Sequence, residues 1–395
     1  MAVQKFLADD PENAKAIAEP YGGTALVYLC LSKYLRLQNQ LSDNFLGAAS
    51  ALLEAGADAN AGFLTKGEFP EFESALYGAA GVAHHAKLTK LLLTYGADPN
   101  DGEVVYHSAE THDPELLKVL VESGKLTKES LSLMLIRKHD WHDTAGVKYL
   151  LEHGADPNLS WGKGVYAIHH ALSRSNALHA IRLLLEYGAD TSVSSAGQNA
   201  VVHAAREGRS DVLALFREKG INTETEGVDK LIAACAAGDQ HAVEVIITSF
   251  PEYLEEIKTI GGELLSRFTL NGNAPGVKQL LDIGIDENTP YLHGDGYFDI
   301  PQGSLAIHVA AWLGRPYMVK LLIEHGAHID IPDGNGQTPL ALAVRACINS
   351  YWTERRSPDS VAALIKAGAS VKNIIFPTGY DEVDELLKKE GLNEL

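Results

Sequence analysis

Short apolar clusters recur along the chain, and each is followed by a glycine and then by polar, turn-forming residues. The clearest case is 319–326, where apolar residues occupy nearly the whole circumference of a helix before Gly326. The same order of residues closes 91–96, 150–154 and 183–188. Glycine adopts the left-handed conformation that ends a helix, so each cluster predicts a helix that stops at its glycine and leads into a turn.

The predicted helix ends are regularly spaced. They fall at Gly56, Gly96, Gly124, Gly154, Gly188, Gly220, Pro251, Gly284, Gly326 and Gly368. The intervals from Gly154 to Gly188 and from Gly188 to Gly220 are 34 and 32 residues. A period of about 33 residues is typical of a repeat that contains two helices and a turn. About ten such repeats fill the chain and leave no room for a separate catalytic domain.

This spacing divides the chain into a lead-in, a repeat array and a cap. Residues 1–22 form the lead-in, 23–372 the array and 373–395 a C-terminal capping helix that begins near Asp381. Segments 33–46 and 347–358 are insertions between paired helices, and 285–304 is a long finger. Each helix is too short to persist alone in water, so neighbouring pairs must stack. The predicted fold is therefore all-α: a curved α-solenoid of helix-turn-helix pairs with hairpin-like loop fingers.

The most regular repeat resembles the ankyrin-repeat family. Leu305-Ala306-Ile307-His308-Val309-Ala310-Ala311 is followed by the Gly326-Ala327 turn and by Thr338-Pro339-Leu340, which together resemble the family's signatures. Only His169 and His308 occupy the signature histidine position, where the resemblance implies a structural role in tying down the turn. Tyr77, Tyr106 and Val202 replace it elsewhere. The resemblance covers essentially the whole chain and implies a binding scaffold with a concave face.

The same resemblance implies which side chains would meet a partner. They follow the small-residue pair of each inner helix, and here they are Glu110, Trp141, Arg174, Arg206, Glu207, Trp312 and Arg345. Tryptophan and arginine often dominate interface energies. The alternative for Trp312 is that its ring fills a gap between repeats. The favoured function is thus non-enzymatic recognition of a protein or peptide.

Charge narrows the class of partner. The 395 residues hold 52 acidic side chains against 33 lysines and arginines, a formal charge of −19. Nucleic acid and anionic membranes need a basic surface, so neither is expected, and a partner with a basic segment fits better. Three scattered cysteines and the lack of an apolar leader at 1–10 indicate a reducing, cytoplasmic setting. We expect a monomer without a cofactor or a metal site.

Histidines supply an alternative in which the array works as an enzyme or a small-molecule binder. His139 and His142 lie at helical i, i+3 spacing beside Asp140, and His293 lies in the 285–304 finger. These residues could provide acid-base chemistry in a groove that the finger closes. A metal site lacks a clear third ligand, and no nucleophile elbow or phosphate-binding loop is present. Pocket depth separates the two hypotheses, because chemistry needs an enclosed cavity.

Overall fold

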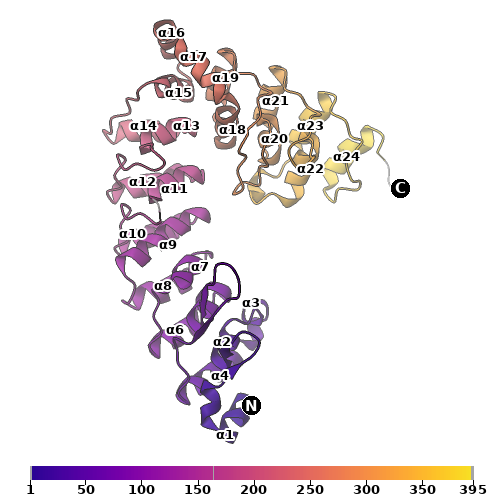
Figure 1. The fold of residues 1–395 in the computed structure, drawn as a ribbon. Helices are drawn as coiled ribbons and strands as arrows, with labels where there is room; N and C mark the ends of the chain where they lie inside the picture. Colours follow the sequence, from indigo (N-terminus) through magenta and orange to yellow (C-terminus); the bar gives the residue numbers. More distant parts are fainter. Residues whose placement is uncertain (1, 163, 393–395) are drawn as a thin grey trace. The chain divides into compact units, whose positions relative to one another are not determined.

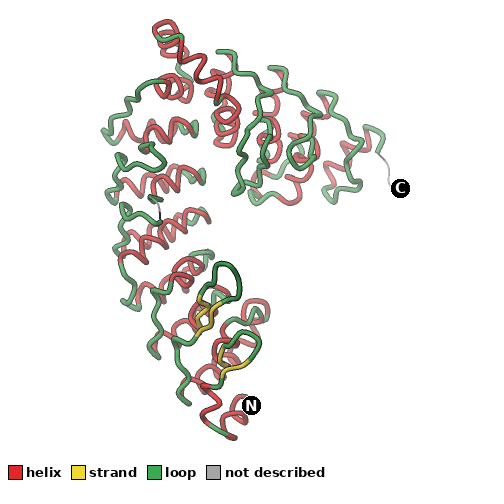
Figure 2. The backbone as a smooth tube through the Cα atoms, in the orientation of Figure 1, coloured by secondary structure: helices red, strands yellow, loops and turns green. Residues whose placement is uncertain are grey.

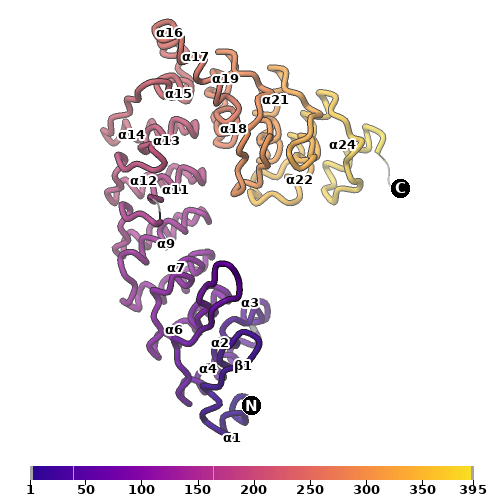
Figure 3. The backbone as a smooth tube through the Cα atoms, viewed as in Figure 1, coloured from indigo at the N-terminus to yellow at the C-terminus, as the bar shows by residue number. Residues whose placement is uncertain are grey.

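The computed structural model describes residues 2–162 and 164–392 and divides into two compact units, Met1–Ala196 and Gly197–Leu395. Each unit is a stack of helix pairs, which Figure 1 colours along the chain. We call the two helices of each pair the first and the second helix. In most pairs the two pack on each other, and between neighbouring repeats most first helices pack on first helices and most second helices on second helices (Figure 3). The prediction of stacked helix pairs is confirmed.

Unit 1 contains two layers of helices. The first layer consists of α2 (Ala25–Cys30), α5 (Ala75–Tyr77) with its π-helical extension η3 (Gly78–Val82), α7 (Gly102–Ser108), α9 (Lys128–Asp140) and α11 (Ala167–Ser173). The second layer consists of α4 (Ser42–Glu54), α6 (Ala86–Thr94), α8 (Pro114–Glu122), α10 (Thr144–Glu152) and α12 (Leu178–Glu186). Helix α1 (Ala2–Asp9) packs on α4, and α3 (Tyr34–Leu37) with η2 (Asn39–Leu41) lies in the predicted insertion at 33–46.

Polar residues begin several of these helices, and glycines follow the ends of several. The Thr127 hydroxyl accepts a hydrogen bond from the Ser130 amide at 3.1 Å, and the Asp113 carboxylate accepts one from the Glu115 amide at 2.9 Å. Both bonds satisfy amides that have no partner inside the helix. Gly96 follows α6 with φ +95°, the conformation that the sequence pattern predicts for a helix end.

Asparagines in three turns of unit 1 tie one repeat to the next. The Asn60, Asn100 and Asn158 side chains donate to the carbonyls of Gly96, Lys125 and Gly188 at 2.9–3.2 Å. Each also accepts a backbone amide from the same later turn, at 2.8–2.9 Å. An amide side chain can donate and accept at once, so one residue fixes the spacing of two turns.

Two short hairpins add sheet to unit 1, shown in yellow in Figure 2. Strands β1 (Ile17–Ala18) and β2 (Gly23–Thr24) are antiparallel, with Ile17 opposite Thr24. Strands β3 (Gly62–Leu64) and β4 (Phe72–Ser74) are also antiparallel, with Phe63 opposite Glu73. The Phe63 ring stacks on Tyr21 at 5.5 Å, so the second hairpin packs on the first.

Unit 2 repeats the two-layer arrangement with one departure. Its first helices are α13 (Ala200–Arg206), α15 (Val228–Ala237), α18 (Gly261–Asn271), α20 (Ala306–Trp312) and α22 (Pro339–Asn349). Its second helices are α14 (Ser210–Glu218), α16 (Gln240–Ser249), α19 (Ala274–Asp282), α21 (Pro316–Glu324) and α23 (Asp359–Lys366). Helix α17 (Glu252–Thr259) replaces a loop finger after α16, and α24 (Asp381–Lys389) lies within the predicted cap at 373–395. Residues 393–395 of that cap lie outside the described residues.

The departure is a shift in the stack at α15. This first helix packs against α19, which is a second helix. The Asn273 side chain donates to the carbonyls of Gly208 and Ala236 at 2.8 and 2.7 Å, and so fastens the start of α19 to two earlier turns. The Phe268 ring lies so close to Gly208 that a side chain there would clash. Close approach at a glycine thus allows the shift.

The 285–304 segment connects α19 to α20 without a helix of its own. Bridges pair Tyr291 with Ser304 and Asp295 with Ile300, so the segment folds back on itself. The predicted insertion at 347–358 contains the end of α22 and the short helix η4 (Thr353–Arg355). Across the described part of the chain, no helix has the length and apolar character needed to cross a membrane.

Candidate functional site

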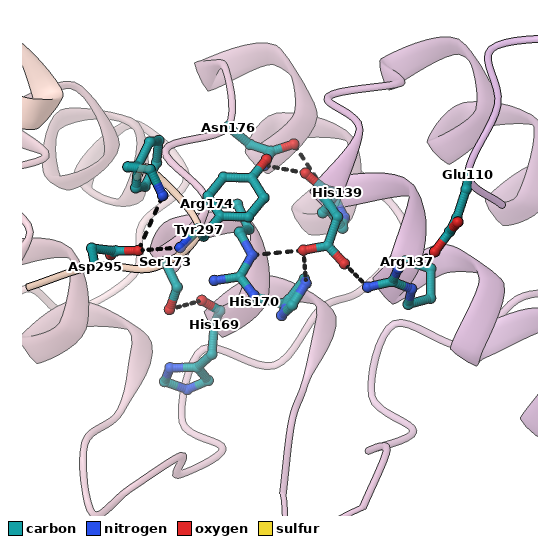
Figure 4. A network of polar contacts seen from close by, with 12 residues as sticks. Glu110, Arg137, His139, His169, His170, Ser173, Arg174, Asn176, Asp295 and Tyr297 are labelled. Carbon is teal, nitrogen blue, oxygen red and sulfur yellow. Dashed lines mark hydrogen bonds and ion pairs between the residues drawn. The ribbon is translucent and has the colours of Figure 1, made fainter. Parts of the chain in front are cut away.

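Asp140 is the centre of a polar network that joins three first helices of unit 1. Its Oδ1 accepts hydrogen bonds from Arg174 Nε at 2.6 Å and from His170 Nε2 at 2.8 Å. Its Oδ2 accepts from Arg137, whose other nitrogen bonds Glu110 at 2.8 Å. Figure 4 shows Glu110, Arg137, His170 and Arg174 converging from neighbouring helices. The sequence-predicted residues Glu110 and Arg174 therefore belong to one network, linked through Arg137 and Asp140.

Burial and charge set the ionisation of this network. Burial raises the pKa of Asp140, but the hydrogen bond and charge of His170 and the bond from Arg174 outweigh it and lower the pKa to about 2. His139 is fully buried, and burial is the main reason that its pKa falls to about 4. Its Nδ1 donates to the Asn176 side chain at 3.1 Å. Near neutral pH the carboxylate is charged and His139 is neutral, so both act as fixed packing and hydrogen-bonding groups.

A buried ion pair lies one turn away. Lys138 Nζ contacts Asp143 Oδ2 at 2.8 Å and donates to the Thr111 carbonyl at 2.6 Å. Asp143 also accepts the Gly146 amide at the start of α10, at 2.9 Å. Trp141 is half-buried beside this pair, and its carbonyl accepts from His112 Nε2 at 2.9 Å. The side chain of Lys138 and the backbone carbonyl of Trp141 therefore both bond residues of the preceding repeat, Thr111 and His112.

Carboxylates and aromatic rings gather around strand β4 and helices α5 and α7. We call this region the acidic patch, and it consists of Glu71, Glu73, Tyr77, Glu103, His107 and Glu110. His107 contacts Glu103 at 3.3 Å and Glu110 at 3.1 Å. Burial, followed by repulsion from Glu71, raises the pKa of Glu103. Burial and the surrounding glutamates raise the pKa of Tyr77 to about 12. The patch thus holds more negative charge than its own neighbours neutralise.

Aromatic side chains border the acidic patch. The Tyr106 ring lies 4.9 Å from His107 and 5.6 Å from Trp161, and the guanidinium of Arg137 covers it at 3.8 Å. Trp161 is 43% exposed. The cation that covers the Tyr106 ring comes from Arg137 of the same chain, whereas Trp161 leaves part of an apolar ring exposed next to Tyr106.

In unit 2 the predicted residues occupy separate ion pairs. Arg206 Nε bonds Asp229 at 2.7 Å. Glu207 lies 3.6 Å from Arg267 and accepts from the Asn271 side chain at 3.3 Å. Arg267 also pairs with Asp295 of the 285–304 finger at 2.8 Å. Glu207 is buried, so its contacts join α13 to α18 inside the unit.

Trp312 and Arg345 come together at the finger. Trp312 is only 7% exposed, and its Nε1 donates to the Phe298 carbonyl at 2.8 Å. Arg345 lies over the Trp312 ring at 4.5 Å and pairs with Asp299 at 2.5 Å. The geometry matches the packing alternative for Trp312, since the ring fixes the finger, whereas Arg345 remains partly open to solvent.

The signature histidines hold the turns, as the resemblance implies. His169 Nε2 donates to the Val193 carbonyl at 2.9 Å, and His308 Nε2 donates to that of Ile331 at 2.8 Å. The Nδ1 atom of His308 accepts the Leu305 amide at 2.9 Å. Each ring therefore connects the start of a first helix to the following turn.

Sequence reasoning missed Arg137, Glu103 and Arg267 as candidate site residues. A signal existed for Arg137, because its i, i+3 spacing from Asp140 places the two side chains on one helix face. A similar signal existed for Glu103, which has i, i+4 spacing from His107 on α7. Arg267 carries no comparable local pattern, because its partners Glu207 and Asp295 lie on other segments that only the fold brings near.

The acid-base alternative finds little geometric support. His139 is fully buried and bonded to Asn176, so it presents no open face to a substrate. His293 belongs to unit 2, where it lines an open pocket of about 150 Å³ with Glu263 and Thr289. No cluster of three metal-binding side chains occurs among residues 2–162 and 164–392.

Comparisons with known proteins match the repeat. A family model described as "Ankyrin repeats (3 copies)" covers 133–227 and 265–374, just over half of the chain. Serine/threonine-protein kinase 12 of Arabidopsis thaliana is 35% identical over 102 residues, or 26% of this chain and 20% of that protein. Mouse Ankyrin repeat domain-containing protein 9 is 28% identical over 94 residues, or 24% of this chain and 29% of that protein.

The chain thus spans less than a third of the length of either relative. The crystal structure of the human ASB11 ankyrin repeat domain is 20% identical, covers 59% of this chain and 96% of that one, and superposes with a TM-score of 0.26. The family model covers more than half of the residues, and the structure consists of stacked helix pairs as the repeat pattern predicts. The chain therefore belongs to the ankyrin-repeat family.

Proposed function

We propose that the chain is a non-enzymatic scaffold whose acidic patch binds a basic segment of a protein or peptide. Ankyrin repeats are in general protein–protein interaction modules. The setting of Glu103 carries the proposal: its carboxyl group is partly buried near Glu71, and burial first and repulsion from Glu71 second raise its pKa. A lysine or arginine from a partner would relieve that repulsion and gain a charge-assisted hydrogen bond.

The surroundings of the patch support a contact of this kind. Arg137 already pairs with Glu110, whereas the carboxylate of Glu103 contacts the imidazole of His107. Trp161 offers an exposed ring on which the apolar stem of a lysine or arginine can pack. The net charge of −19 would also speed the approach of a basic partner.

Of the other predicted contact residues, two would touch the partner and three would only position neighbouring groups. Arg174 extends the polar row beyond the patch, and in unit 2 Arg345 with Asp299 offers a second polar contact. Arg206, Glu207 and Trp312 position these groups from within the stack. The three cysteines are free and buried, which suits a reducing, cytoplasmic compartment. The proposed scaffold acts as a monomer and uses no cofactor.

A peptide-display selection followed by binding measurements tests the proposal. We expect selected peptides to be rich in lysine and arginine and to bind more weakly as salt increases. Glu103→Gln/Glu110→Gln should weaken binding about tenfold and flatten the salt dependence, since each lost contact is charge-assisted. Glu122→Gln/Glu152→Gln, on the second-layer helices α8 and α10, makes the same charge change and should leave affinity within about twofold.

Two outcomes would contradict the proposal. Neutral or acidic selected peptides would exclude a basic partner. An equal loss of affinity in both double variants would mean that the net charge of the protein, rather than the acidic patch, attracts the peptide.

A further inference from the structure

Helix α16 carries more apolar side chains than the rest of the unit buries. Its sequence holds Val243, Val245, Ile246 and Ile247 within five residues, and Phe250 follows directly. A helix with apolar residues around most of its circumference is normally covered on more than one side. Here only Val243 is buried, whereas Val245 is 49% exposed and Phe250 39% exposed.

The cause is the shift in the stack. In unit 1, α10 packs on α12, and in unit 2, α21 packs on α23, so second helices cover one another. Helix α19 would be the next such neighbour for α16, but it packs on α15 instead. Within the described residues, α16 packs mainly on α15 and makes a smaller contact with α17, and it stands out from the second layer in Figures 1 and 3.

Helix α17 widens the uncovered surface and gives it a charge. The Phe250 and Tyr253 rings stack with centroids 5.1 Å apart. Segment 240–259 carries Glu244, Glu252, Glu255 and Glu256 but only one basic residue, Lys258, which pairs with Glu255. An apolar ledge therefore lies beside exposed carboxylates.

We propose that the α16–α17 ledge, formed by Val245, Ile246, Phe250 and Tyr253, binds an amphipathic helix of a partner protein that carries lysine or arginine beside its apolar stripe. A helix fits because a second helix of the next repeat covers the equivalent surface elsewhere in the stack. Basic flanks fit because the ledge is bordered by glutamates. A second copy of the chain is disfavoured, since it would bring the two sets of glutamates together.

This surface is independent of the acidic patch, which belongs to unit 1. The probe is a fluorescent leucine-lysine peptide of about 18 residues, long enough to form a helix once bound. A peptide of the same composition in scrambled order tests whether the apolar stripe matters. Binding is followed by anisotropy. The substitutions in the ledge and at Tyr317 change no charge, so the attraction between net charges stays constant among them.

We expect the amphipathic peptide to bind saturably and the scrambled one at least about tenfold more weakly. Val245→Ser/Phe250→Ser should raise the dissociation constant about tenfold, because apolar anchors dominate such interfaces. Tyr317→Ser, which truncates an apolar side chain 68% exposed on α21, should leave it unchanged. Glu103→Gln/Glu110→Gln should leave the difference in affinity between the amphipathic and the scrambled peptide unchanged, which separates this proposal from the first.

Equal binding of both peptides, or equal effects of the ledge and Tyr317 variants, would overturn the inference. So would sedimentation showing a dimer that Val245→Ser dissociates, because the ledge would then be a self-association surface. Should the double variant unfold, Val245→Ser alone decides the question, since that side chain is half exposed.

Discussion

Replacing Asp140 by asparagine tests whether polar contacts between first helices hold the repeats together. The substitution keeps the size of the side chain and one acceptor oxygen. It removes the charge that pairs with Arg137 on the same helix and with Arg174 on the next. The side chain is only 7% exposed, so water replaces little of what is lost.

The pKa of Asp140 gives the magnitude and the sign. Burial raises this pKa, but contacts with His170 and the two arginines bring it from its ordinary 3.8 to about 2 in the folded protein. A difference of nearly two units corresponds to about 2 kcal/mol of stability. Because the folded pKa is the lower one, this contribution is fully present above pH 3.8. It disappears as the pH falls from 3.8 towards 2.

Urea unfolding of the wild type and of Asp140→Asn, measured between pH 7 and pH 2.5, checks the prediction. We expect a constant difference of about 2 kcal/mol in the free energy of unfolding from pH 7 to pH 5, shrinking at lower pH. Hydrogen exchange of the α9 and α11 amides locates the loss, since repeat arrays can unfold in parts. Glu152→Gln, which breaks an exposed pair with Lys148, should change stability by less than about 0.5 kcal/mol.

The reasoning is refuted if Asp140→Asn costs no more than Glu152→Gln at pH 7. A cost that stays constant down to pH 2.5 would equally refute it, because the stabilisation would then not come from the ionised carboxylate.

Three further changes test other parts of the fold. Trp312→Phe removes the bond to the Phe298 carbonyl and should cost about 1 kcal/mol, with faster proteolysis within 285–304 as the measurement. Gly208→Ala places a Cβ 2.4 Å from the Phe268 ring at φ +69°, so the unfolding midpoint in urea should fall by the equivalent of more than about 2 kcal/mol. Burial raises the pKa of every thiol, to about 12 for Cys235 and about 11 for Cys347, so a thiol reagent at pH 8 should react slowly until the protein is unfolded. The residues concerned are Cys30, Cys235 and Cys347.

Features set by short stretches of sequence were predictable. Gly96, Gly188 and Gly326 were placed at helix ends from the residues around them, and all three have φ between +83° and +99°. Helix α17 was also within reach. Pro251 followed by Glu252 and Glu255 is a typical helix start, since proline suits the first turn and acidic residues favour the helix dipole.

Contacts between distant segments were not predictable. The apolar pattern of α15 shows which residues are buried but not that α19 is the helix that covers them. Gly208 reads as an ordinary turn glycine, and only the approach of Phe268, sixty residues later in the chain, explains why a side chain is excluded there. The pattern of apolar residues along a sequence therefore predicts which side chains are buried, but it does not predict which other helix covers them.

The candidate site shows the same division. Glu110 and Arg174 follow from their place after the small residues of a first helix. Their connection through Arg137 and Asp140 depends on the spacing of three helices. Trp312 was assigned to the surface by the same rule, yet the 285–304 finger covers it. An insertion can therefore bury a position that the regular repeat leaves open.

Internal pairing decides where a basic partner can bind. The arginines of the first helices are already committed to carboxylates of the same unit: Arg137 to Glu110 and Asp140, Arg174 to Asp140, Arg206 to Asp229, Arg267 to Glu207 and Asp295, and Arg345 to Asp299. These acids gain little from a further cation. Glu103, whose ion-pair contact is with His107, gains more. Different residues should therefore control stability and recognition. Asp140→Asn should lower the stability of the fold and leave affinity for a basic peptide nearly unchanged. Glu103→Gln should weaken binding of the peptide and leave stability nearly unchanged.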